Sequence, residues 1–287
     1  SKFGSEDTLN LVIYESLKNY SFLFEKKKMP SNDSAFNNLT LISRAFQSCY
    51  LDKEQTEFYF FDLINNKEVD YSRYTFFYIN NLIEQKKFQI AKDTTDQIDP
   101  LNSSLLVRQT KNWIDNKKFE KFSEIFSCKS ESSILSEFFY LIANLYSSQN
   151  DFEKSNFYIN ISHFLNSKFK YNLTLLAENY YKSNDYKKTE NILNNFNEND
   201  DIYYWYKIKK KASIISKELG KQDSLNFINS KIKKKKNPSL KILFDMANIT
   251  KGFEEYESSI VYYNKILSKI SLNSESRAEI LYRRGSC

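Results

Sequence analysis

Side chains that could do acid–base, nucleophilic or metal chemistry are few and scattered in this chain. His163 is the only histidine, which rules out a histidine-cluster metal site and leaves any histidine-based triad without a nucleophile motif beside it. The acidic pairs Asp200-Asp201 and Glu254-Glu255 fall where helices are predicted to begin, and carboxylates there favour the helix dipole. The four glycines are isolated, so they form no glycine-rich phosphate loop. We therefore expect no catalytic residue, no metal site and no cofactor, and a protein that is not an enzyme.

The three cysteines, Cys49, Cys128 and Cys287, are widely spaced. Neither a metal-ligand spacing nor a disulfide framework fits their number and positions, so buried or incidental thiols are the favoured interpretation. The compartment stays unknown, with the cytoplasm favoured and the periplasm as the alternative if a signal peptide has been removed. The chain begins without Met and stops inside the helical phrase EILYRRGSC, so we expect it to be a piece of a longer chain.

Lysine runs at residues 207–211 and 231–236 raise the possibility of nucleic-acid chemistry. Tyr203, Tyr204, Trp205 and Tyr206 stand just before the first run, and a single-strand binding surface needs both phosphate neutralisation and stacking. However, lysines near a helix end are also favourably placed at the negative end of its dipole, and the net charge of +6 over 287 residues is modest. Nucleic acid is therefore the less favoured partner.

The composition predicts helices joined by short polar links. Only 4 Gly and 3 Pro occur, although sheet proteins need many glycine-containing turns. Hydrophobic residues make up 41%, with 24 Phe and 21 Tyr, which is ample for a packed core. No stretch approaches the roughly 20 apolar residues of a membrane helix, so we expect a soluble protein without membrane insertion.

An aromatic residue recurs at intervals close to 34 residues. Phe88, Phe119, Phe152, Tyr186 and Tyr256 are separated by 31, 33, 34 and 70 residues, the last interval being twice 35. The phrases around them are similar: KKFQIAK, KKFEKFS, NDFEKSN, NDYKKTE and EEYESSI. A self-similar period in the low thirties is typical of stacked helix-turn-helix units.

Two positions within this unit are mostly small. In the first helix the position holds Ile79, Thr110, Ala143, Ala177, Ala212, Ala247 and Gly285. In the second helix it holds Ala91, Phe122, Ser155, Thr189, Ser224 and Ser259. Small residues at matched places let two antiparallel helices approach closely, and stacking of successive pairs then supplies the core.

These units resemble the tetratricopeptide repeat family. The resemblance is carried by Phe139, Ile142, Ala143, Tyr146, Phe152, Ser155 and Ile159, and again by Leu173, Leu176, Ala177, Tyr180, Tyr186, Thr189 and Leu193. The chain departs from the family pattern in having Ser or Thr at the usual second-helix Ala, and the closing Pro only at Pro100. The resemblance implies an all-α fold, a right-handed superhelical α-solenoid of antiparallel helix pairs with about 14 to 16 helices.

The repeats are expected over residues 72–102, 103–135, 136–169, 170–204, 205–239 and 240–277, with a truncated unit at 278–287. Residues 1–71 are expected to extend the stack as irregular pairs or to cap it, with helices over 6–28, 34–50 and 53–67. No composition shift separates this part from the rest, so no domain boundary is predicted.

In tetratricopeptide arrays the first helix of each unit lines the concave, ligand-binding face. The resemblance places there, by position in the unit, Arg73, Phe76, Asn80, Tyr140, Asn144, Tyr171, Glu178, Tyr181, Lys182, Tyr206, Lys209, Lys241, Phe244 and Asn248. Asn side chains could hydrogen-bond an extended backbone, aromatic side chains could anchor it, and lysines could attract acidic segments.

We therefore predict a non-catalytic scaffold that binds a partner peptide or helix on this face. The alternatives are a basic solenoid that binds nucleic acid, and a spacer or assembly platform within a larger protein. Partner identity and self-association stay open.

Overall fold

The computed structural model describes residues 6–31, 37–66, 70–271 and 274–287. The described part contains sixteen α-helices and no strand, which confirms the all-α prediction and the expected number of helices. The first five are α1 (Glu6–Lys26), α2 (Asn37–Tyr50), α3 (Thr56–Ile64), α4 (Tyr74–Glu84) and α5 (Phe88–Asp96). The next five are α6 (Leu105–Asp115), α7 (Glu120–Ile125), α8 (Glu131–Ser148), α9 (Phe152–Leu165) and α10 (Asn172–Lys182). The last six are α11 (Tyr186–Leu193), α12 (Asp201–Glu218), α13 (Lys221–Ile232), α14 (Leu240–Gly252), α15 (Tyr256–Leu267) and α16 (Glu275–Gly285).

Contacts group these helices into two compact units, where the sequence predicted one continuous array. The first unit contains residues 1–96 and 109–185, and the second contains residues 97–108 and 186–287. The division therefore falls inside α6, and residues 97–108 group with helices far along the chain. Of the predicted N-terminal helices, residues 34–36 and 67 lie outside the described part of the chain.

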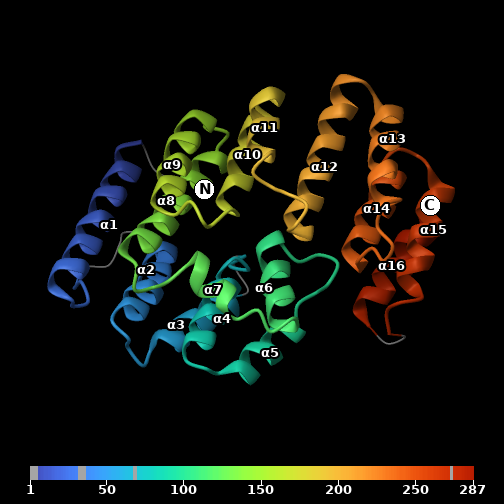
Figure 1. Ribbon diagram of the computed structural model, residues 1–287. Helices are drawn as coiled ribbons and strands as arrows, with labels where there is room; N and C mark the ends of the chain where they lie inside the picture. The colour runs from blue at the N-terminus through green and yellow to red at the C-terminus, as the bar shows by residue number, and fades with distance from the viewer. Residues whose placement is uncertain (1–5, 32–36, 67–69, 272–273) are drawn as a thin grey trace. The chain divides into compact units, whose positions relative to one another are not determined.

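Helices that follow one another in sequence pack as pairs, as a helical-repeat protein requires (Figure 1). We call the first helix of each predicted repeat the A helix (α4, α6, α8, α10, α12, α14 and α16) and the second the B helix (α5, α7, α9, α11, α13 and α15). The packing is most extensive between α8 and α9, between α14 and α15, and between α12 and α13. In the described residues no helix is long and apolar enough to cross a bilayer.

Each A–B link turns through one residue in the left-handed region. Lys86, Lys117, Asn150, Asn184 and Glu254 have φ between 54° and 68°, and each lies two residues before one of the recurring aromatics. The N–H of the following residue donates to the carbonyl five residues earlier, at distances of 2.8 to 3.0 Å, which ends the A helix in a Schellman-type turn. The link between α12 and α13 uses Gly220 instead, with φ of 104°. The repeat is thus a repeat of backbone conformation as well as of side chains.

The matched small positions let the helices of a pair approach closely, and they also exchange a hydrogen bond. The hydroxyls of Ser155, Ser224 and Ser259 donate to the carbonyl oxygens of Ala143, Ala212 and Ala247, at 2.7, 2.7 and 2.8 Å. All three serines are buried, so each hydroxyl needs a partner inside the core. Ala at the B-helix position could not make this bond, which gives the serine a structural reason.

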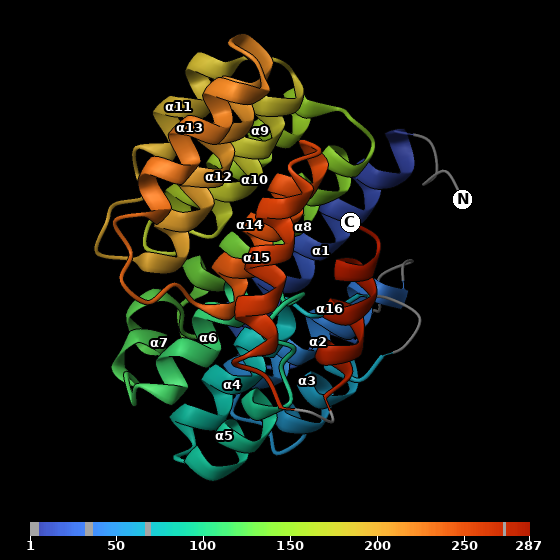
Figure 2. The ribbon, with the colours of Figure 1, turned by 90° about the vertical axis from the view of Figure 1, so that its right-hand side faces the viewer.

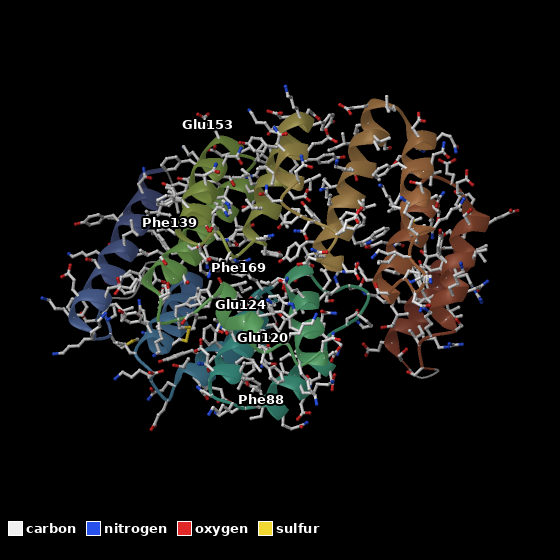
Figure 3. All side chains as sticks on the ribbon, viewed as in Figure 1. Phe88, Glu120, Glu124, Phe139, Glu153 and Phe169 are labelled. Atoms are coloured by element: carbon white, nitrogen blue, oxygen red, sulfur yellow. A yellow bond between two sulfur atoms is a disulfide. The ribbon has the colours of Figure 1, made fainter. Side chains whose placement is uncertain are left out.

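Aromatic residues form the core of the first unit. Phe46 of α2 contacts Phe60 of α3, Phe77 of α4 and Phe126, with ring centroids 5.0 to 5.8 Å apart. Phe169, labelled in Figure 3, extends this cluster toward α10, since its ring lies 5.9 Å from that of Phe77.

In the second unit α14 packs on two sides. Met246 and Ile242 contact residues of α12 and α13, while Leu243, Phe244 and Ala247 contact α15 and α16. Figures 1 and 2 show α14, α15 and α16 side by side. Leu101, which lies between α5 and α6 in sequence, is part of this second core cluster.

The cysteine prediction was wrong in one respect. Cys49 and Cys128 form a disulfide bond with a Cα–Cα distance of 5.7 Å, drawn in yellow in Figure 3, and both are buried. The bond ties the last turn of α2 to the link between α7 and α8, across 79 residues of sequence. Packing of α2 against Phe126 places the two sulfur atoms together, which no spacing rule could foresee. Cys287 is a free, half-buried thiol.

Candidate functional site

The fourteen predicted groove residues fall into the two units. The first unit holds Arg73, Phe76, Asn80, Tyr140, Asn144, Tyr171, Glu178, Tyr181 and Lys182. The second unit holds Tyr206, Lys209, Lys241, Phe244 and Asn248. Each unit brings a part of its set together, and the two clusters differ in how completely their charges are compensated.

In the first unit Arg73 forms a buried ion pair with Glu137 of α8. Arg73 Nε donates to Glu137 Oε1 at 2.8 Å, Nη2 donates to Oε2 at 2.5 Å, and Nη2 also donates to Asn172 Oδ1 at 3.0 Å. The guanidinium lies 3.6 Å from the ring centroid of Tyr140 and 4.9 Å from that of Tyr171. A bidentate, stacked guanidinium of this kind connects α4 to α8 and α10 and fixes their register.

The electrostatics of this pair are those of a closed structural contact. Burial raises the pKa of Glu137 despite the attraction of Arg73, and burial likewise raises the pKa of Tyr140. Burial also acts to lower the pKa of Arg73, but Glu137, Tyr140 and Tyr171 together more than offset it. One carboxylate therefore compensates one guanidinium, and the pair has no excess charge to offer a partner.

Phe76, Asn80 and Tyr140 are buried in the first unit, which corrects the expectation that they line an open face. Phe76 packs on Phe122 and Phe169, with centroids 5.8 and 5.2 Å apart. Asn80 Nδ2 donates to the carbonyl of Phe126 at 3.3 Å. In the first unit α4 packs against α7, Phe76 also contacts Phe169, and Tyr140 of α8 contacts Arg73, so side chains of a predicted groove become core.

The other predicted residues of the first unit lie nearer the surface. Asn144 and Lys182 are exposed, and Tyr171, Glu178 and Tyr181 are half-buried.

In the second unit three cations surround one carboxylate. Asp245 of α14 accepts from Trp205 Nε1 at 2.9 Å and forms ion pairs with Lys209 Nζ at 2.9 Å and Lys241 Nζ at 3.2 Å. Arg108, in the second turn of α6, also interacts electrostatically with Asp245. We call Arg108, Lys209 and Lys241, with Asp245, the basic cluster.

The basic cluster is partly open and carries more positive than negative charge. The side chains of Asp245, Lys241 and Lys209 are 10%, 17% and 31% exposed. The Nε of Arg108 is buried and has no hydrogen-bond partner among the described residues. Three positive charges thus face one carboxylate, whereas the Arg73 pair has one of each.

The pKa directions follow from this imbalance. Burial lowers the pKa of Arg108 and of Lys241, although Asp245 opposes the effect in both. Burial acts to raise the pKa of Asp245, but Lys209 and Lys241 lower it overall. The two lysines thus favour the anionic form of Asp245, and the cations around it would gain from a second carboxylate.

The remaining predicted residues of the second unit have structural contacts. Phe244 is buried, and this corrects its expected place on an open groove. Tyr206 packs edge-on against Phe196 with centroids 5.7 Å apart, and Asn248 Oδ1 accepts from the Tyr263 hydroxyl at 2.9 Å. Only Lys209 and Lys241 of the predicted set therefore reach the basic cluster.

Several lysines of the two runs are bound to groups of the protein. Lys207 donates to the carbonyl of Phe196 at 3.1 Å, Lys211 lies 3.8 Å from Glu190, and Lys235 lies 2.7 Å from Asp201. Lys233, Lys234 and Lys236 are exposed. The runs therefore do not form one uninterrupted row of lysines that could all meet phosphates.

In the described residues no group of His, Cys, Asp and Glu could hold a metal ion. His163 is half-buried, and burial lowers its pKa. Sequence reasoning missed Arg108 and Asp245, and it considered Trp205 only as a stacking residue for nucleic acid, whereas Trp205 donates to Asp245. One signal was available: Asp245 is the only acidic residue in the apolar phrase ILFDMA, and it stands four residues after Lys241.

Comparison of the sequence with models of known protein families gives no match, and comparison with curated protein sequences gives none either.

Proposed function

We propose that this protein is a non-catalytic interaction scaffold that binds an acidic segment of a partner protein on the A-helix side of its second unit. The observation that carries the proposal is the basic cluster, in which three cations face the single carboxylate of Asp245. The tetratricopeptide-like pattern supports it, because the A helices of such arrays hold extended partners.

The chemistry of the cluster selects an anion. Partly buried cations without full compensation are costly, and a carboxylate from a partner would relieve that cost at the same time as it gained the hydrogen bonds. Lys209 is more exposed than Lys241 and Asp245, so it is the ion-paired residue of the cluster that an incoming acidic group would contact first. Positive charge in such a place also speeds the encounter with an acidic segment.

Affinity capture with matched lysine variants tests this function. The full chain would be immobilised as wild type, Lys209→Gln and Lys234→Gln, and exposed to lysate of the source cells with and without nuclease. We expect proteins that survive nuclease, that are depleted at least fivefold by Lys209→Gln, and that Lys234→Gln retains, since Lys234 is exposed and lies outside the cluster.

Two results would overturn the proposal. If Lys209→Gln captures the same proteins in the same amounts as wild type, the basic cluster is not the binding site. Loss of all captured proteins with nuclease would instead make nucleic acid the partner.

We further propose that the protein matures in an oxidising compartment. The disulfide between Cys49 and Cys128 supports this, because such bonds persist outside the reducing cytosol. Thiol labelling after acid quenching of source cells measures it: labelling of Cys287 alone is expected, and labelling of all three cysteines would contradict the proposal.

A further inference from the structure

A segment of the chain packs into a core cluster of the second unit, and we call the space that its Leu101 fills the Leu101 pocket. Residues 97–104 connect α5 to α6 without forming helix or strand. Leu101 is fully buried there, in a cluster with Leu243, Phe244, Ala247, Tyr263, Ile266 and Ile280. The pocket is built by α14, α15 and α16, which come about 140 residues later in the chain.

Polar contacts hold the segment as they would hold a bound peptide. Lys241 Nζ donates to the carbonyl oxygen of Leu101 at 2.6 Å, a contact that any residue could make with its backbone. Asn102 Nδ2 donates to Glu279 Oε2 of α16 at 2.9 Å, a contact that requires a side chain with a hydrogen-bond donor. The pocket therefore contacts one backbone carbonyl, one apolar side chain and one polar side chain of the segment. Peptide-binding grooves recognise extended segments through the same combination of contacts.

The segment is shaped by its own residues. Asp99 Oδ1 accepts from the backbone N–H of Leu101 at 2.7 Å and of Asn102 at 3.3 Å, and Asp99 Oδ2 accepts from Asn102 Nδ2 at 2.9 Å. Pro100 restricts the backbone between them. The bonds of this Asx-type turn lie within residues 99–102 and do not involve α14, α15 or α16, so a separate peptide of the same sequence would be pre-organised for the pocket.

We propose that the Leu101 pocket is a peptide-recognition site, occupied by residues 99–102 as an internal ligand, and that it takes a partner segment of the pattern Asp-Pro-Leu-Asn in their place. This inference rests on the proposed function and adds the sequence class of the bound segment. Lys241 belongs to both the pocket and the basic cluster, so an acidic group next to the partner's pattern reaches the cations that the internal ligand leaves uncompensated.

Competition by the internal ligand determines how the pocket behaves. Because residues 99–102 are tethered, they compete at an effective concentration on the order of millimolar. A free peptide with the same contacts binds the wild-type protein weakly, and removal of the internal leucine opens the pocket to it.

Fluorescence anisotropy with a labelled peptide of residues 97–104, QIDPLNSS, tests the inference on the full chain. We expect the peptide to bind Leu101→Asp at least tenfold more tightly than wild type. Leu219→Asp, the same substitution at an exposed position of the second unit, should behave as wild type. A peptide with Asp in place of its leucine should bind none of them.

A folded Leu101→Asp protein that does not bind the peptide would overturn the inference and make Leu101 an ordinary core residue. A dimer formed by exchange of residues 97–108 between two copies would also overturn it. If Leu101→Asp does not fold, hydrogen exchange of the wild type decides: the amides of Leu101 and Asn102 should exchange at least a hundredfold faster than those of residues 243–247. Equal rates would contradict an exchangeable ligand.

The two proposals fail separately. Capture that depends on Lys209, with no peptide binding at the pocket, removes only the Leu101 site. Peptide binding at the pocket, with captured proteins insensitive to Lys209→Gln, removes only the role of the basic cluster.

Discussion

At the scale of single residues, the A–B links adopt the same left-handed conformation with residue types that suit it to different degrees. Asn150 and Asn184 are well suited to the left-handed region, because a short polar side chain can hydrogen-bond locally. Lys86, Lys117 and Glu254 adopt the same conformation although it costs about 1 kcal/mol for such residues. Packing of the two flanking helices holds the link in this conformation, so the protein tolerates the cost.

Lys117→Asn should therefore stabilise the protein by about 0.5 kcal/mol, since Asn accepts the φ of 54° at this exposed position. Urea unfolding followed by circular dichroism measures the change. Lys118→Asn, one residue further and outside the left-handed region, serves as control and should give no gain. Equal effects of the two variants would show that the link conformation is not the cause.

Asp245 is the residue on which the charge balance of the second unit depends. Asp245→Asn should destabilise the protein by about 3 kcal/mol at pH 7, because it leaves partly buried cations without their carboxylate. Asp223→Asn, at an exposed position in the same unit, should cost no more than about 0.5 kcal/mol.

The sign of the pH dependence follows from the same carboxylate. Its folded pKa lies below the ordinary value of 3.8, so its contribution is present above that value and is lost as the pH falls through the lowered pKa. Chemical unfolding between pH 7 and pH 2 measures the free energy of unfolding, and this free energy should fall less for Asp245→Asn than for wild type. An unchanged acid loss would mean that other carboxylates dominate it.

At the scale of helix pairs, the serine-to-carbonyl bond is the recurring device. The bond forms only when the two helices lie close together, so it stabilises a close pair. The short distance leaves no room for a larger side chain at this position. The same geometry in α8/α9, α12/α13 and α14/α15 shows that the pair, rather than the single helix, is the repeated object.

Ser224→Ala should cost about 1 kcal/mol through loss of the bond to the Ala212 carbonyl. Ser224→Val should cost about 2 kcal/mol or more, because a larger side chain forces α12 and α13 apart. Ser230→Ala, exposed on α13, is the control. The midpoint of thermal unfolding gives the order of the three variants, and a Val variant as stable as the Ala variant would contradict the close-approach argument.

At the scale of the whole molecule, the described residues form two compact units, and one disulfide bond joins Cys49 to Cys128. The disulfide lies in the first unit, and closing a loop of 79 residues stabilises a protein by about 4 kcal/mol in the chain-entropy view. The second unit contains only Cys287, so reduction leaves its core unchanged.

Reduction, or the double variant Cys49→Ser/Cys128→Ser, should therefore split unfolding into two transitions. The first unit should unfold at lower urea and the second at the original midpoint. Trp113 reports on the first unit and Trp205 on the second, so Trp113→Phe and Trp205→Phe separate the two fluorescence signals. Coincident shifts of both signals would show that the units unfold as one. Cys287→Ser is the control and should shift neither.

The sequence by itself determined what is local in this protein. The positions of the A and B helices, the links before each recurring aromatic and the small residues at the crossings all follow from patterns within about 35 residues. Such features depend on helix period and turn chemistry, which neighbouring residues encode directly. Lys209 and Lys241 were predicted as binding residues in the same way, from their place within the unit.

Only the tertiary structure decided which side chains of the A helices are exposed and which are buried. Arg73 meets Glu137 and Asn172 across 64 and 99 residues, Cys49 meets Cys128, and Leu101 enters a core built near the end of the chain. A regular array brings each repeat against the next, so a periodic pattern contains no information about contacts between distant repeats. Contacts with Phe126, Phe169 and Leu101 helped to bury Asn80, Phe76 and Phe244, and the fold brought Arg108 and Asp245 into electrostatic interaction.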